Sequence, residues 1–132
     1  MAQMFRWRAG LTAAVTSALC VIVCAISLNS AQALSCLTGT QRFDLTAEPA
    51  YWSIVLPSGV QCTQELRYPP LFIDDVTIIT PPRNGSLVVD GASFRYLPNP
   101  EFNGLDTFVL SVSGSNGRVN GSTFIYVDVT VR

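Results

Sequence analysis

The sequence predicts an all-β fold, an antiparallel β-sandwich of about seven strands. Three observations support this prediction: apolar and polar residues alternate with a period of two, the alternating runs are short, and turn signals separate them. Asn-Gly, Asp-Gly and Pro-Asn-Pro sequences recur at close intervals between residues 82 and 108, as expected for successive hairpins. Residues 34–132 show no convincing helical period, and they are about as numerous as one β-sandwich domain requires.

The alternation is clearest in the second half of the chain. In the final run, alternate residues of Ile125–Val131 form an apolar face, while Phe124 and Tyr126 lie on the opposite, outward face. The run Asp106–Ser113 alternates in the same way and places Phe108 on its inward face. These two runs therefore predict two strands, each with one face directed toward the core.

The remaining strands are less cleanly patterned. A polar segment, Ser113–Ser122, is expected to join the last two strands, either as a recognition loop or as a plain hairpin connection. The short piece Cys62–Arg67 is expected to be an edge strand. Further strands are expected at Gln41–Ala47, Tyr51–Leu56, Val76–Thr80, Leu87–Val89 and Phe94–Tyr96.

The first 33 residues are typical of a signal peptide. Arg6 and Arg8 precede the uncharged, apolar run Leu11–Leu28, and Ala31-Gln32-Ala33 resembles a signal-peptidase site. Cleavage after Ala33 would leave one domain, residues 34–132, which we expect to be secreted, periplasmic or exposed on the cell surface. The alternative is an uncleaved anchor, because the apolar run is near the lower length limit for spanning a bilayer.

The charge pattern argues against several classes of function. All eight cations are arginines, they are scattered, and nine carboxylates oppose them. Nucleic-acid binding and polybasic adsorption to membranes both need clustered cations, so we expect neither. The sequence has no histidine and no lysine, which removes the usual bases for a serine nucleophile. We expect no enzyme activity, although a pair of carboxylates such as Glu48 and Glu65 is formally available for glycoside hydrolysis.

The four cysteines agree with export. Cys20 and Cys24 would leave with the signal peptide, so Cys36 and Cys62 remain. An even pair in an exported domain predicts one structural disulfide, worth about 3–4 kcal/mol by the chain-entropy estimate.

Residues 82–131 contain a spaced motif, which includes Tyr96-Leu97-Pro98 and Phe102-Asn103-Gly104-Leu105-Asp106-Thr107-Phe108. This motif resembles the bacterial Ig-like and cadherin-like repeats of large surface adhesins. The resemblance extends from Asp74 to Arg132 and ends on the valine-rich strand Val127–Val131. It is fairly specific for fold and poorly specific for function. The matching residues are Gly85, Tyr96, Pro98, Phe102, Gly104, Asp106 and Phe108.

Each motif residue also has a physical role. Pro98 ends a strand, Phe102 is expected to plug one end of the sandwich, and Phe108 returns the chain to the core. Gly104 supplies a positive φ, and Asp106 accepts hydrogen bonds from loop amides.

The resemblance also raises the question of calcium, which tandem repeats often hold between modules. Asp74, Asp75 and Asp106 could form at most part of such a site, because calcium takes six to eight oxygen ligands and adjacent strand residues face opposite sides. No other cofactor is expected. Since the repeats usually occur in long arrays and this sequence carries one copy, we do not expect the role of a rigid stalk.

Function is the least determined property. We expect an exported module that binds a protein or envelope component through its sheet edges or the Ser113–Ser122 segment. The alternatives are a calcium-stabilised adhesin-type domain and carbohydrate binding by exposed aromatic side chains, which can also pack beneath a loop instead. The aromatic candidates are Tyr51, Trp52, Phe124 and Tyr126.

Overall fold

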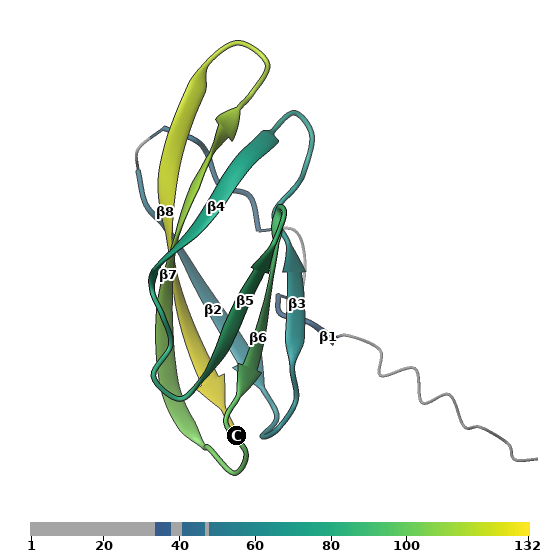
Figure 1. Cartoon of the computed structure of the whole chain (residues 1–132), viewed down its shortest axis with the longest axis vertical. Helices are drawn as coiled ribbons and strands as arrows, with labels where there is room; N and C mark the ends of the chain where they lie inside the picture. The colour runs from purple at the N-terminus through teal and green to yellow at the C-terminus, as the bar shows by residue number, and fades with distance from the viewer. Residues whose placement is uncertain (1–33, 38–40, 47) are drawn as a thin grey trace, which may run out of the picture. The chain divides into compact units, whose positions relative to one another are not determined.

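The computed structural model describes residues 34–37, 41–46 and 48–132. In these residues two four-stranded sheets pack face to face (Figure 1), which confirms the Ig-like all-β prediction. The predicted signal segment, residues 1–33, and Ala47 lie outside the described residues. Across the described ranges, no helix has the length and apolar character needed to cross a bilayer.

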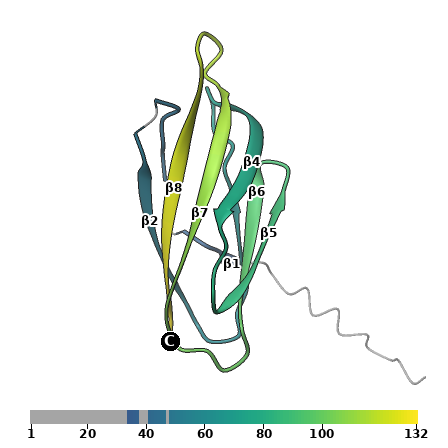
Figure 2. The ribbon, with the colours of Figure 1, turned by 60° about the vertical axis from the view of Figure 1, so that its left-hand side comes forward.

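The strands divide evenly between the two layers, which Figure 2 shows from a second direction. One sheet has the order β1 (Leu34–Ser35), β3 (Cys62–Glu65), β6 (Ser93–Pro98) and β5 (Gly85–Asp90). The other has the order β2 (Ala50–Leu56), β8 (Asn120–Val131), β7 (Gly104–Ser115) and β4 (Phe72–Thr80). The two-residue β1 was not expected, and because of it β3 has a neighbour on each side and is not an edge strand.

Two strand pairs correct the prediction of a purely antiparallel sandwich. β2 runs parallel to β8, and β1 runs parallel to β3. A period-two pattern determines which face of a strand is buried, but it carries no information about the direction of the neighbouring strand. The sequence therefore predicts the faces of β2 and not its orientation.

Aromatic rings from both sheets meet in the core. Phe108 of β7 lies edge-on to Phe94, with ring centroids 5.4 Å apart, and stacks on Tyr96 at 5.8 Å. All three side chains are essentially inaccessible to solvent. Burying each ring stabilises the fold by about 2–3 kcal/mol, so this cluster accounts for much of the contact between the layers.

Residues 41–46 correct a second prediction, because they form no strand. Phe43 nevertheless packs into the core, with its ring 5.9 Å from that of Trp52 and 5.5 Å from that of Tyr68. The Phe43 amide donates to the Tyr68 hydroxyl at 2.8 Å, and that hydroxyl donates back to the Phe43 carbonyl. Apolar alternation here reflects a segment that packs on the sandwich through Phe43 and Leu45 without pairing to a sheet.

The Cys36–Cys62 disulfide is present, as the sequence predicts. It joins the segment after β1 to the start of β3 and closes a loop with a sequence separation of 26. Both cysteines are buried, so the bond fastens the N-terminal segment from inside the fold.

Candidate functional site

The three carboxylates considered for calcium do not come together. Asp74 and Asp75 lie on β4, where the Asp75 carboxylate accepts the Thr77 hydroxyl at 2.8 Å, whereas Asp106 is buried on β7. Within the described part of the chain, no group of three or more acidic, cysteine or histidine side chains is placed to hold a metal ion. Asp74, Asp75 and Asp106 therefore form no common cluster, and calcium binding stays a prediction.

Asp106 instead anchors a corner of the sandwich. Its carboxylate accepts hydrogen bonds from the Arg83, Asn84 and Thr107 amides, each at 3.0 Å. A fourth bond, at 2.8 Å, comes from the Tyr96 hydroxyl. The side chain is only 4% exposed, so its charge is balanced almost entirely by these donors. The arrangement ties the β4–β5 turn to β6 and β7, so the Asp106 carboxylate has a structural role.

Burial raises the pKa of the Tyr96 phenol, and the hydrogen bond to Asp106 and the negative charge of that carboxylate raise it further. The folded state therefore holds the Tyr96 proton more tightly than the unfolded state, in which tyrosine titrates near pH 10. The resulting stability is fully present below about pH 10 and is lost as the pH rises above it.

We expect this linkage to be visible in alkaline unfolding. Urea unfolding between about pH 8 and pH 11 should show a free energy of unfolding that falls with pH more steeply in the wild-type chain than in Tyr96→Phe. The variant lacks the phenol and so lacks its contribution to the slope. Identical slopes in the two proteins would show that Tyr96 ionises as readily in the folded state as in the unfolded one.

The other motif residues build the end of the sandwich where β7 begins. Phe102 is half-buried against the core, and its amide donates to the Asn99 carbonyl at 3.1 Å. Gly104 has a φ of 137°, a value that side-chain-bearing residues rarely adopt. These residues shape the turn between β6 and β7, and none of them presents a reactive group.

The aromatic candidates separate into two environments. Trp52 is 5% exposed and faces the core, which removes it from the predicted binding surface. Tyr51 is 74% exposed, and Phe124 and Tyr126 also reach solvent on the outer face of the β2-β8-β7-β4 sheet. Because Tyr51 and Tyr126 are register partners, their rings stack with centroids 5.2 Å apart.

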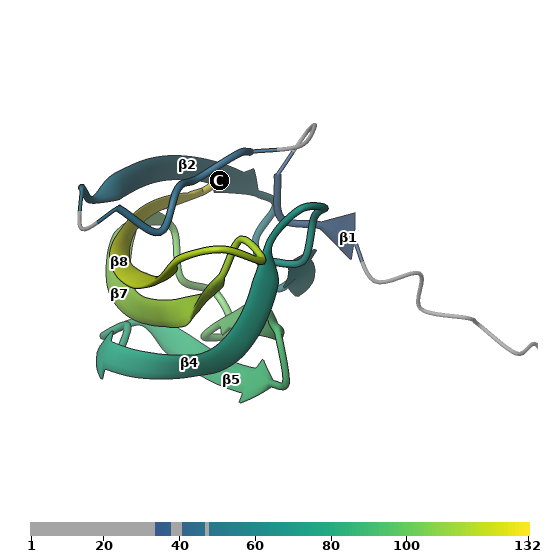
Figure 3. The ribbon, with the colours of Figure 1, turned by 90° about the horizontal axis from the view of Figure 1, so that it is seen from above.

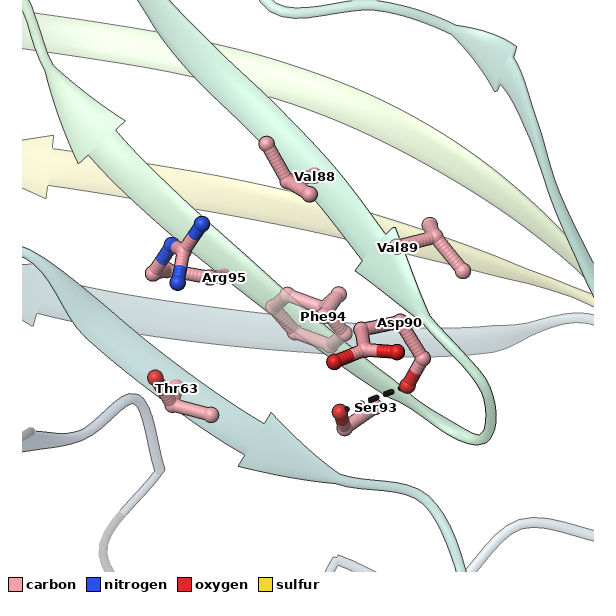
Figure 4. Close-up of a pocket in the computed structure, with 7 residues that line it drawn as sticks. All are labelled: Thr63, Val88, Val89, Asp90, Ser93, Phe94 and Arg95. Carbon is pink, nitrogen blue, oxygen red and sulfur yellow. Dashed lines mark hydrogen bonds between the residues drawn. The ribbon is translucent and has the colours of Figure 1, made fainter.

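A hollow of about 240 Å³ lies on the opposite sheet, beside the β5–β6 turn. Figure 4 shows the side chains that line it, and the Ser93 hydroxyl donates to the Asp90 carbonyl at 2.9 Å. Its residues are Thr63, Val88, Val89, Asp90, Ser93, Phe94 and Arg95. The one hydroxyl that donates a bond here is directed at a backbone carbonyl, so the hollow has no activated nucleophile.

The segment Ser113–Ser122 is a hairpin connection, the second of the two alternatives that the sequence left open, and most of it is strand. β7 continues to Ser115 and β8 starts at Asn120, which leaves a four-residue turn. The Asn116 side-chain oxygen accepts the Arg118 amide at 3.1 Å and the Val119 amide at 3.0 Å. The glycine and serine residues suggested a flexible segment, but most of the segment belongs to the paired strands β7 and β8, and Asn116 holds the turn between them by hydrogen bonds.

Two glycines explain how this hairpin fits beneath its neighbours. Gly114 and Gly121 are register partners. A Cβ at Gly114 would overlap the Phe72 carbonyl, and a Cβ at Gly121 would overlap the Leu45 carbonyl. The backbones of β4 and of residues 41–46 therefore approach the hairpin closely at its two glycines, at the end of the sandwich that Figure 3 shows from above. Only residues without a side chain permit this approach.

Together these segments form what we call the loop end: residues 41–44, 67–72 and 116–119. Two hollows of about 430 and 290 Å³ lie here and share Tyr68, Pro70 and Leu71. Phe72 and Val119 project nearby with 63% and 64% exposure. Of these three segments, the sequence predicted only the 116–119 turn as part of a recognition surface. The sequence gives no sign that three distant segments meet at this place.

Residues 69–127 fit the family model described as bacterial Ig domain. This confirms the resemblance drawn from the Tyr96–Phe108 motif. A search of curated proteins finds no match.

Proposed function

We propose that the chain is a non-enzymatic module that works outside the cytoplasm and binds a protein partner through the loop end, in keeping with the match of residues 69–127 to the bacterial Ig domain model. The disulfide supports the location, since such bonds persist mainly in oxidising compartments. The absence of histidine and lysine from the sequence, and the full engagement of Asp106 by hydrogen-bond donors, support a binding role over catalysis.

The observation that carries this proposal is the clustering at the loop end. Two adjoining hollows lie beside two exposed apolar side chains, Phe72 and Val119. An aromatic anchor next to a concave, partly apolar surface is the usual centre of a protein interface. The glycine contacts fix the segments against one another, which lowers the entropy that binding would otherwise cost.

Carbohydrate binding is the second candidate, and the stacked pair Tyr51–Tyr126 favours it. The high exposure of Tyr51 leaves ring surface available on which a sugar could stack. Without Trp52, this platform consists of Tyr51, Tyr126 and Phe124.

Site-specific photo-cross-linking separates the two candidates. A photoreactive phenylalanine analogue replaces Phe72 in one protein and Tyr51 in another, each produced in the bacterium that makes the chain. We expect a discrete, protease-sensitive adduct from position 72 and none from position 51. A protease-resistant, glycosidase-sensitive adduct from position 51 alone would support the carbohydrate function and contradict the proposal.

A further inference from the structure

Among the described strands, the edges of β2 and β5 are the long ones with little protection, and β5 is the one that borders the hollow of about 240 Å³. Proteins usually guard edges with charges, prolines, bulges or extreme shortness. β1 has two residues, and β4 carries Asp74 and Asp75 together with two breaks in its register to β7. β5 pairs with β6 in unbroken register over all six residues, and its only charge is the terminal Asp90.

Two hydrogen bonds identify which backbone groups of β5 are free. The Ala92 carbonyl accepts the Leu66 amide at 2.8 Å, so even-numbered residues of β6 direct their backbone groups toward β3. The Asn84 carbonyl accepts the Asn99 amide at 2.8 Å, so even-numbered residues of β5 are the ones that bond to β6. Alternation along the ladder then leaves the backbone groups of Gly85, Leu87 and Val89 directed away from the sheet.

From this geometry we propose that the β5 edge accepts an extended segment of a partner polypeptide, which adds a fifth strand to the β1-β3-β6-β5 sheet. Backbone bonds to Gly85, Leu87 and Val89 would hold the segment. The hollow beside Val88 and Arg95 (Figure 4) lies on this sheet next to β5 and could receive one side chain of the added segment. Strand addition of this kind combines backbone affinity with side-chain specificity from such pockets.

The extent of the edge argues against a second copy of the chain as the occupant. Six residues at about 3.3 Å per residue, and a strand spacing near 5 Å, give a contact of about 100 Å² per copy. A stable interface buries about 800 Å² on each partner, so pairing of the two edges alone would be far too small. A flexible segment can add contacts in the hollow that a rigid second sandwich edge could not reach.

The test uses the full chain and a defined probe, an acetylated hexapeptide of alternating valine and threonine. Backbone amide signals are followed by NMR during titration. We expect saturable shifts centred on Leu87 and Val89, together with slower hydrogen exchange of both amides. The same peptide with every second amide N-methylated, on the edge that would face β5, should produce no shifts because it cannot bond to the strand.

Two variants provide the matched comparison. Val88→Lys introduces the charge that guarded edges carry and should weaken peptide binding about tenfold or more. Val55→Lys, at a similarly exposed valine on β2, should leave the affinity unchanged. Shifts confined to β2 or β4, equal binding of the N-methylated peptide, or no binding would each overturn the proposal. Shifts of the same amides on concentrating the chain alone would overturn it in favour of a second copy. The cross-linking result at Phe72 is independent of all these outcomes.

Discussion

Replacing Asp106 with alanine should lower the free energy of unfolding by about 4 kcal/mol. The substitution leaves three backbone amides and the Tyr96 hydroxyl without their acceptor in a place that water barely reaches. Each unsatisfied buried donor costs about 1–3 kcal/mol, and partial relaxation of the β4–β5 turn limits the sum. Chemical denaturation followed by fluorescence measures the difference.

Two further variants control this experiment. Asp128→Ala removes a carboxylate from the exposed face of the neighbouring strand and should change stability by less than about 0.5 kcal/mol. Tyr96→Phe removes only one of the four donors and should cost about 1–2 kcal/mol. If Asp106→Ala were no more destabilising than Asp128→Ala, the carboxylate would not be the anchor of this corner.

Loss of the Cys36–Cys62 bond should cost about 3–4 kcal/mol. The bond closes a loop with a sequence separation of 26, and its removal restores conformational freedom to the unfolded chain. It also frees the N-terminal segment that it holds against β3. The double variant Cys36→Ser, Cys62→Ser should therefore unfold at a markedly lower denaturant concentration than the oxidised wild type.

A reductant provides the internal control for this second prediction. Dithiothreitol should shift the unfolding midpoint of the wild-type chain toward that of the double serine variant and leave the variant itself unchanged. An unchanged wild-type midpoint after verified reduction would show that the disulfide contributes nothing to stability.

Most of the fold could be predicted from the sequence because the patterns that indicate strands and turns are local. Alternation in β7 and β8 determines which side chains are buried, and the Asp90-Gly91 turn sets the β5–β6 hairpin. The pairing of β2 with β8 could not be predicted from the sequence, since the direction of a strand depends on contacts between residues far apart in the chain. The same limit applies to residues 41–46, whose apolar pattern fits either a strand or a packed segment.

The candidate site was harder to predict from the sequence because it consists of three segments that meet only in the folded chain. Phe72 follows a proline pair and gives no sequence signal of its exposure beside the hairpin tip. Trp52 and Tyr51 are adjacent and face opposite sides. Trp52 is the buried one because it shares its face with Ile54 and Leu56, and it packs against Phe43. The glycines at 114 and 121 looked like flexible loop residues, whereas close backbone contacts require them.

The most direct test of recognition at the loop end compares two apolar side chains of similar exposure at different places on the sandwich. Phe72 is 63% exposed at the loop end, and Leu105 is 73% exposed near the start of β7. With the photoreactive residue at each position in turn, we expect a discrete protein adduct from position 72 and none from position 105. An adduct from position 105 with none from position 72 would contradict the assignment of the binding surface.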